Sequence, residues 1–210
     1  LSTITVFFRQ IVELFKGLFR FRMNEETRYV INLLISMIPI AVVGFFFKDA
    51  IEGLFTSNLV LVGIMLLVTA CLLTFAGLAK PRTGTITPKN AFIIGLAQAL
   101  AVLPGLSRSG TTIATGLILG NRKESVAQFS FLMVLAPILG KMVLDLMSGE
   151  LAAQSIGTAP LLAGFAAAFV VGCLACKFMI NIVKRGQLNW FAIYCTLVGG
   201  LAIIRYFVIQ

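Results

Sequence analysis

The sequence predicts an all-α integral membrane protein, a polytopic helical bundle that contains a re-entrant helical hairpin. Of the 210 residues, 59% are hydrophobic and 12% are charged, whereas a soluble domain carries about 25% charged residues. Several apolar stretches reach the length of about 20 residues that a helix needs to cross the hydrocarbon core. One further stretch is too long for one crossing and too short for two. We expect residues 1–210 to form a single transmembrane domain.

Five stretches are predicted to span the membrane. They share a length near that of a span and are free of charge, except for Lys141 in the third, and they cover residues 29–47, 56–79, 125–144, 151–176 and 186–204. Residues 1–18 read as part of a sixth helix. Asn24, followed by Glu25 and Glu26, predicts the N-cap of the first complete span, with acidic residues in its first turn.

The basic residues between the spans predict the orientation, because Lys and Arg concentrate in cytoplasmic loops. Four groups of bases mark such loops: Lys16, Arg20, Arg22 and Arg28; Lys80, Arg82 and Lys89; Arg122 and Lys123; Lys177, Lys184 and Arg185. By contrast, Lys48 is accompanied by Asp49 and Glu52, and residues 145–160 contain no Lys or Arg, so both loops and the C-terminus are expected outside. The net charge of +9 is therefore mainly an orientation signal and requires no nucleic-acid partner.

The segment between two of these cytoplasmic loops is expected to enter the membrane and return on the same side. Residues 80–90 and 121–124 both read as cytoplasmic, which leaves a re-entrant hairpin at about 91–120. Its arms, 92–103 and 112–119, are each about half a span, and they are broken at Pro104-Gly105 and at Gly110. Irregular backbone near mid-membrane is tolerated only where it is buried in protein or lines a wet cavity.

The tip of this hairpin is the predicted functional site. Arg108 is the only charged residue between Lys89 and Arg122, and an ionisable residue inside the bilayer is costly and marks a functional site. A new helix is expected to start at about Gly110. A helix N-terminus, a guanidinium and several hydroxyls together suit a phosphate or pyrophosphate. The predicted catalytic residues are Ser107, Arg108, Ser109 and Thr112, and the predicted substrate-binding residues are Gln98, Gly105, Gly110 and Thr111.

Two simpler interpretations stand beside this one. Arg108 would be an ordinary loop residue, and the serines would be helix caps, if the hairpin were two full spans. That requires residues 112–119 to cross the membrane, for which eight residues are too few. Gln98 is equally well explained as an amide that joins two membrane helices.

The chain contains no histidine, which removes several hydrolytic mechanisms from within it. Ser-His-Asp hydrolases, phosphatases with a histidine nucleophile and HExxH zinc sites all require imidazole. The type 2 phosphatidic-acid phosphatases, which share the Ser-Arg dipeptide, are excluded for the same reason.

The string PGLSRSGTT, preceded by GLAQALAVL and followed by AQFSFLMVLAPILG, closely resembles the second signature region of the undecaprenyl pyrophosphate phosphatase family of the bacitracin-resistance type. The resemblance extends over the whole chain, because the span with Pro39, the basic loop at 80–89 and the last two helices fall where that family has them. It implies a multi-pass hydrolase of the bacterial plasma membrane. The activity implied is removal of the terminal phosphate from a C55 polyprenyl pyrophosphate, which recycles the lipid carrier of cell-wall assembly.

The resemblance also implies a fold and a cofactor. The family has two interleaved inverted repeats, each with one re-entrant hairpin, and the hairpin tips meet in a cavity open to the outer face. Ser107, Arg108, Ser109 and Thr112 match its pyrophosphate-binding residues. A divalent cation, Mg²⁺ or Ca²⁺, is expected on glutamates of a first signature, EGxTE followed by a serine-rich turn ending in His. That signature is expected before residue 1, so no metal ligand is predicted in this chain, and these 210 residues alone are expected to be inactive.

The expected partners are the polyprenyl pyrophosphate and the membrane lipids, and the sequence is compatible with a homo-oligomer. A transporter or flippase of anionic lipids or solutes is the alternative function, because inverted repeats with helices broken at mid-membrane are typical of transporters.

Overall fold

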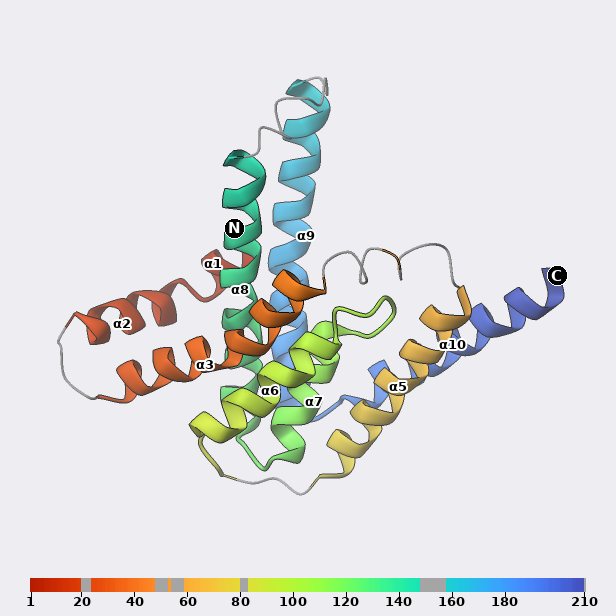
Figure 1. Ribbon diagram of the computed structural model, residues 1–210, viewed down its shortest axis with the longest axis horizontal. Helices are drawn as coiled ribbons and strands as arrows, with labels where there is room; N and C mark the ends of the chain where they lie inside the picture. Colours follow the sequence, from red (N-terminus) through yellow and green to blue (C-terminus); the bar gives the residue numbers. More distant parts are fainter. Residues whose placement is uncertain (20–23, 48–52, 54–58, 80–82, 148–157, 210) are drawn as a thin grey trace.

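The computed structural model describes residues 1–19, 24–47, 53, 59–79, 83–147 and 158–209. The helices of these residues are α1 (Ser2–Val6), α2 (Phe8–Leu18), α3 (Glu25–Phe46), α5 (Leu59–Leu78), α6 (Pro88–Leu100), α7 (Arg108–Ile118), α8 (Lys123–Met147), α9 (Thr158–Arg185) and α10 (Asn189–Ile209). Five of them, α3, α5, α8, α9 and α10, are long and apolar enough to cross a membrane. The prediction of an all-α polytopic membrane protein is confirmed (Figure 1).

The N-terminal segment differs from the prediction of one continuous helix. The chain breaks between α1 and α2 at Phe7, whose φ and ψ are −104° and 18°. Phe7 is only 2% exposed, and its ring lies 5.7 Å from that of Phe131 on α8. Helix α2 then exposes Arg9, Glu13 and Lys16 on one side. Such an amphipathic helix favours the membrane–water interface over a crossing, which explains the break.

Helix α3 begins as its sequence predicts. The side chain of Asn24 accepts a hydrogen bond of 2.9 Å from the backbone N–H of Thr27. Glu25 and Glu26 occupy the first turn, where a negative charge interacts favourably with the helix dipole. The predicted N-cap is confirmed.

Helices α5 and α10 lie against each other along most of their length (Figure 1). Two glycines allow the backbones to approach closely. A Cβ atom added at Gly199 would lie 2.9 Å from the carbonyl oxygen of Gly63, and one added at Gly63 would lie 3.0 Å from that of Gly199. Small residues at such a crossing are typical of membrane helix pairs. The reciprocal contact is compatible with an inverted repeat, which stays a prediction.

Substitution of Gly199 by alanine is expected to destabilise the protein by about 1–3 kcal/mol, because the new methyl group overpacks the crossing. Gly200 is the matched control, since a Cβ there meets no atom within 4 Å. Gly200→Ala is expected to leave stability unchanged or to raise it slightly through helix propensity. Thermal unfolding of the two variants in detergent measures the difference, and equal midpoints would refute the close crossing.

The two ends of the hairpin that α6 and α7 form lie next to each other. The backbone N–H of Gly84 donates to Gly120 O at 3.3 Å, and that of Arg122 donates to Gly84 O at 3.0 Å. The side chain of Asn121 donates to Gly116 O at 2.9 Å and accepts from the amide of Asn90 at 3.1 Å. These bonds tie the segment before α6 to the segment after α7.

The two arms are too short to cross the membrane. Helix α6 has 13 residues and α7 has 11, which at about 1.5 Å per residue gives lengths of about 20 and 16 Å. The hydrocarbon core is about 30 Å thick. These lengths argue against the interpretation that Arg108 lies in a loop between two full spans. That the hairpin enters and leaves the membrane on one side stays a prediction.

The orientation of the bundle stays a prediction. Many of the loop charges that predict it lie outside the described residues, namely Arg20, Arg22, Lys48, Asp49, Glu52, Lys80 and Arg82, and so do residues 148–157.

Candidate active site

The turn between α6 and α7 lies against α5 (Figure 1). Gly105, within this turn, has a φ of +91°, a conformation that side chains with a Cβ atom rarely adopt. A Cβ at this position would also lie 2.5 Å from the carbonyl oxygen of Val62 on α5. The structure therefore explains Gly105 by backbone conformation and by close approach to a helix. Its predicted role as a substrate-binding residue is not needed to account for it.

Helix α7 starts two residues earlier than predicted, at Arg108 rather than at Gly110. The reason is Ser107, which is the N-cap: its hydroxyl oxygen accepts from the backbone N–H of Gly110 at 3.3 Å. The N–H of Gly110 is thus already bonded. No acceptor in the described part of the chain reaches the N–H groups of Arg108 and Ser109. These two groups, at the positive end of α7, are the ones able to bind an anion.

Thr112, which is predicted to be catalytic, is bonded within its own helix in this structure. Its side chain is fully buried, and its hydroxyl donates back to Arg108 O at 3.0 Å and to Ser109 O at 3.3 Å. A threonine hydroxyl has one proton, so that proton is committed to the first turn of α7. The Thr112 hydroxyl therefore stabilises this turn, and its catalytic role stays a prediction.

Three of the predicted residues have buried side-chain polar atoms that lack a hydrogen-bond partner in the described part of the chain. They are both amide atoms of Gln98, the hydroxyl of Thr111 and the Nε of Arg108. Gln98 and Thr111 are 0% and 3% exposed. A buried polar group that lacks a partner costs about 1–3 kcal/mol, and native proteins seldom tolerate several close together without a functional reason. Ser107, Arg108 and Ser109 are themselves half-buried, so they remain accessible to a ligand.

The arrangement can bind an anion with several acceptor oxygens. The family model described as Bacitracin resistance protein BacA matches residues 1–201. The chain belongs to the BacA family.

Curated relatives of this BacA-family chain carry the name undecaprenyl-diphosphatase. One from Bacteroides fragilis is 61% identical over 207 residues, which cover 97% of this chain and 78% of the relative. One from Christiangramia forsetii is 51% identical over 204 residues, covering 97% and 77%. One from Methanosphaera stadtmanae is 36% identical over 213 residues, covering 97% and 75%.

The part of the BacA-family chain that the structure describes contains no group of three His, Cys, Asp or Glu side chains able to hold a metal ion. The donors at the tip are hydroxyls, an amide, backbone N–H groups and a guanidinium, whereas Mg²⁺ and Ca²⁺ prefer carboxylate and carbonyl oxygens. The tip residues therefore fit the phosphate groups of a ligand and do not fit a cation.

Two buried hydroxyls outside the hairpin were not predicted from the sequence. Thr69 on α5 is 0% exposed, and its oxygen accepts a 3.1 Å hydrogen bond from the backbone N–H of Ser107. Ser130 on α8 is also buried, and its hydroxyl has no partner among the described residues. In the sequence, each of them stands out only as a hydroxyl in an apolar membrane helix. That pattern does not show which distant residue the hydroxyl contacts.

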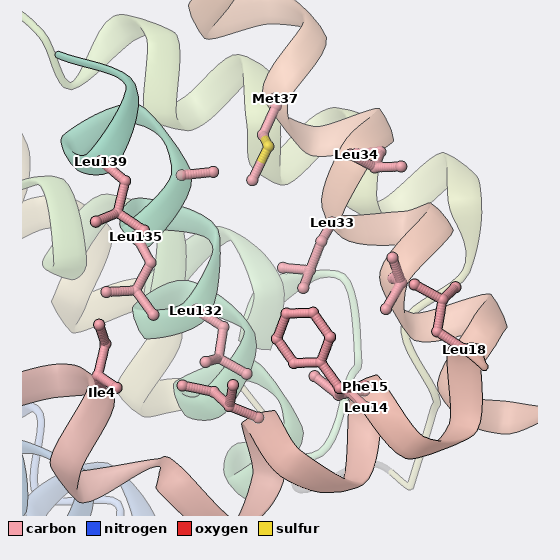
Figure 2. A pocket seen from close by; sticks show the side chains of 13 residues that line it. Ile4, Leu14, Phe15, Leu18, Leu33, Leu34, Met37, Leu132, Leu135 and Leu139 are labelled. Carbon is pink, nitrogen blue, oxygen red and sulfur yellow. The ribbon is translucent and has the colours of Figure 1, made fainter. Parts of the chain in front are cut away.

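A separate cavity of about 360 Å³ lies between α1, α2, α3 and α8. Figure 2 shows apolar side chains lining it from these helices, among them Leu14, Phe15, Leu33, Met37, Leu132 and Leu135. Every lining residue is apolar and none belongs to the hairpin tip. An apolar cavity excludes charged groups, so it is not part of the phosphate site.

Proposed function

We propose that this chain is an undecaprenyl pyrophosphate phosphatase, which removes the terminal phosphate from a C55 polyprenyl pyrophosphate. The observation that carries the proposal is the identity of 51–61% to curated undecaprenyl-diphosphatases over 97% of the chain. The site geometry supports it, because the motif residues place a guanidinium and two N–H groups without an acceptor among the described residues at one helix end. In the reaction the bond between the bridging oxygen and the terminal phosphorus breaks, and water supplies the oxygen of the released phosphate.

The proposed role of Arg108 is to bind two oxygens of the pyrophosphate at once. A planar guanidinium matches this geometry better than a point charge. Phosphoryl transfer builds charge on the oxygens of the transferred group, and enzymes accelerate it mainly by positioning and electrostatic stabilisation. The partial burial of Arg108 strengthens such an interaction, because fewer water molecules screen it.

The serines and the helix end are proposed to complete the phosphate cradle. The N–H groups of Arg108 and Ser109 point along the axis of α7 toward its N-terminus, where the helix dipole favours an anion. The hydroxyl of Ser107 accepts from Gly110 and retains its own proton for a phosphate oxygen. Gln98 and Thr111 add buried polar groups in the tip half of the hairpin. No step is assigned to a cation, because none of these residues fits one.

The location in the membrane is part of the proposal. We infer that the protein lies in the bacterial plasma membrane, that the hairpin enters from the cytoplasmic side and that the site opens to the outer face. The cluster of bases at the hairpin ends, Lys89, Arg122 and Lys123, supports the cytoplasmic assignment of those ends. The prenyl chain would stay in the hydrocarbon phase, with its charged end at the tip.

The function is tested by measuring phosphate release from undecaprenyl pyrophosphate by the purified full-length protein, with Mg²⁺ and with a chelator. The proposal predicts release of inorganic phosphate and formation of the lipid monophosphate in equal amounts. Binding or transfer of the intact lipid across vesicles, without any phosphate release, would instead identify a transporter, which the broken helices also suit.

A further inference from the structure

We propose that Thr69, on α5, is a positioning residue for the pyrophosphate-binding turn, an inference that rests on the proposed function. Thr69 is fully buried and makes two hydrogen bonds of defined direction. Its hydroxyl donates to Met65 O at 3.0 Å and accepts from the backbone N–H of Ser107 at 3.1 Å. Because the proton points back along α5, a lone pair is left facing the turn. One side chain therefore joins the span to the residue that caps α7.

The bond from Ser107 replaces one that the sequence of α7 cannot make by itself. In a capping box, a Glu or Gln at the third helical position accepts from the backbone N–H of the N-cap residue. The third position here is Gly110, which has no side chain. A Cβ at Gly110 would lie 3.0 Å from the Ser107 hydroxyl oxygen and 3.3 Å from the methyl carbon of Thr69. The threonine thus supplies the missing acceptor and also occupies the space beside the glycine.

This arrangement determines which N–H groups remain for a ligand. The N–H of Ser107 bonds to Thr69, and the N–H of Gly110 bonds to the Ser107 hydroxyl. Those of Arg108 and Ser109 are left, and their direction depends on the orientation of the first turn of α7. Loss of the Thr69 acceptor would leave the Ser107 N–H without a partner, which is unfavourable for a buried donor and favours a shift of the turn. A misplacement of about 1 Å at a reacting group can cost about a hundredfold in rate.

Two variants of Thr69 separate the hydrogen bond from simple packing. Thr69→Val retains the shape and the methyl group and removes the acceptor, whereas Thr69→Ser retains the hydroxyl and removes the methyl group. Thr74→Val is the matched control on the same helix, because the hydroxyl of Thr74 donates only to Ala70 O, at 2.8 Å, and its side chain is exposed. We expect Thr69→Val to lower kcat by about tenfold to a hundredfold, with a smaller change in KM, and Thr69→Ser and Thr74→Val to stay near the wild type.

Hydrogen–deuterium exchange of the turn provides a readout that does not depend on turnover. Thr69→Val is expected to speed exchange of the amides at 106–110, and Thr69→Ser is expected to restore slow exchange. Equal exchange and equal kcat in Thr69→Val and the wild type would overturn the proposal, and so would a Thr69→Ser variant as impaired as Thr69→Val. If the wild type released no phosphate, the proposed function would fall, and the exchange rates alone would decide whether Thr69 positions the turn.

Discussion

Replacement of Arg108 by lysine is expected to lower phosphate release from undecaprenyl pyrophosphate by at least about a hundredfold in the full-length protein. Lysine retains the positive charge but loses the planar pair of donors that binds two phosphate oxygens. An arginine that stabilises a transferred phosphoryl group is worth about 10³–10⁵ in kcat. Initial rates of phosphate release, with equal amounts of folded protein, measure the effect.

Arg122→Lys is the control for this substitution. Arg122 is an exposed arginine at the base of the same hairpin. Among the described residues of the segment before α6, its bond is from its backbone N–H to Gly84 O. Its replacement is expected to leave the rate within about twofold, since exposed charges contribute little. A rate for Arg108→Lys that matches the control would remove Arg108 from the proposed site.

Gln98→Met is expected to stabilise the protein and to impair its function at the same time. Met has a size and flexibility close to those of Gln, but it brings no polar atom into the buried site. Both amide atoms of Gln98 lack a partner among the described residues, so their removal is expected to raise the free energy of unfolding by about 1–2 kcal/mol. If the amide binds the substrate, kcat/KM falls about tenfold or more, because a bound polar group then loses its partner. Thermal unfolding and phosphate release are measured on the same preparation.

Asn121 provides the opposite case in the same hairpin. Its amide is also buried, but it donates to Gly116 O and accepts from Asn90. Asn121→Leu should therefore destabilise the protein, in contrast to Gln98→Met. A Gln98→Met variant that unfolds more easily than the wild type, like Asn121→Leu, would support the simpler interpretation that Gln98 joins two helices.

Much of the fold was predictable because the membrane imposes simple rules of length and charge. The five spans were predicted from apolar stretches. The hairpin was predicted because its segment is too long for one span and too short for two, and because basic residues at both of its ends place these ends on the same side. The break at Phe7 was not predictable from hydrophobicity, since residues 1–18 contain enough apolar residues to read as a span. The contact of Phe7 with Phe131 joins residues far apart in the sequence, and no local pattern reveals it.

The residues of the candidate site were predictable, but the start of α7 and the hydrogen-bond partners of these residues were less so. Arg108 stands out as the lone charge in the hairpin, and the serines and glycines around it predict an irregular turn. The start of α7 was misplaced by two residues because Ser107, rather than Gly110, ends the turn as a cap. The contacts of Thr112 and Gly105 were not predicted, because they involve a backbone carbonyl one turn away and a carbonyl on α5. The roles of both residues in the site stay predictions. Thr69 was missed because its partner lies 38 residues away.

Equilibrium binding of a polyprenyl pyrophosphate analogue, with a methylene group in place of the bridging oxygen, tests most directly whether the turn at 104–112 holds a pyrophosphate. The wild type and Arg122→Lys are expected to bind the analogue with the same Kd, and the analogue is expected to slow deuterium exchange at 106–110. Arg108→Lys is expected to bind at least about tenfold more weakly, a loss of about 1.4 kcal/mol. Equal binding by Arg108→Lys and the wild type, without protection of the turn, would contradict the assignment of this site.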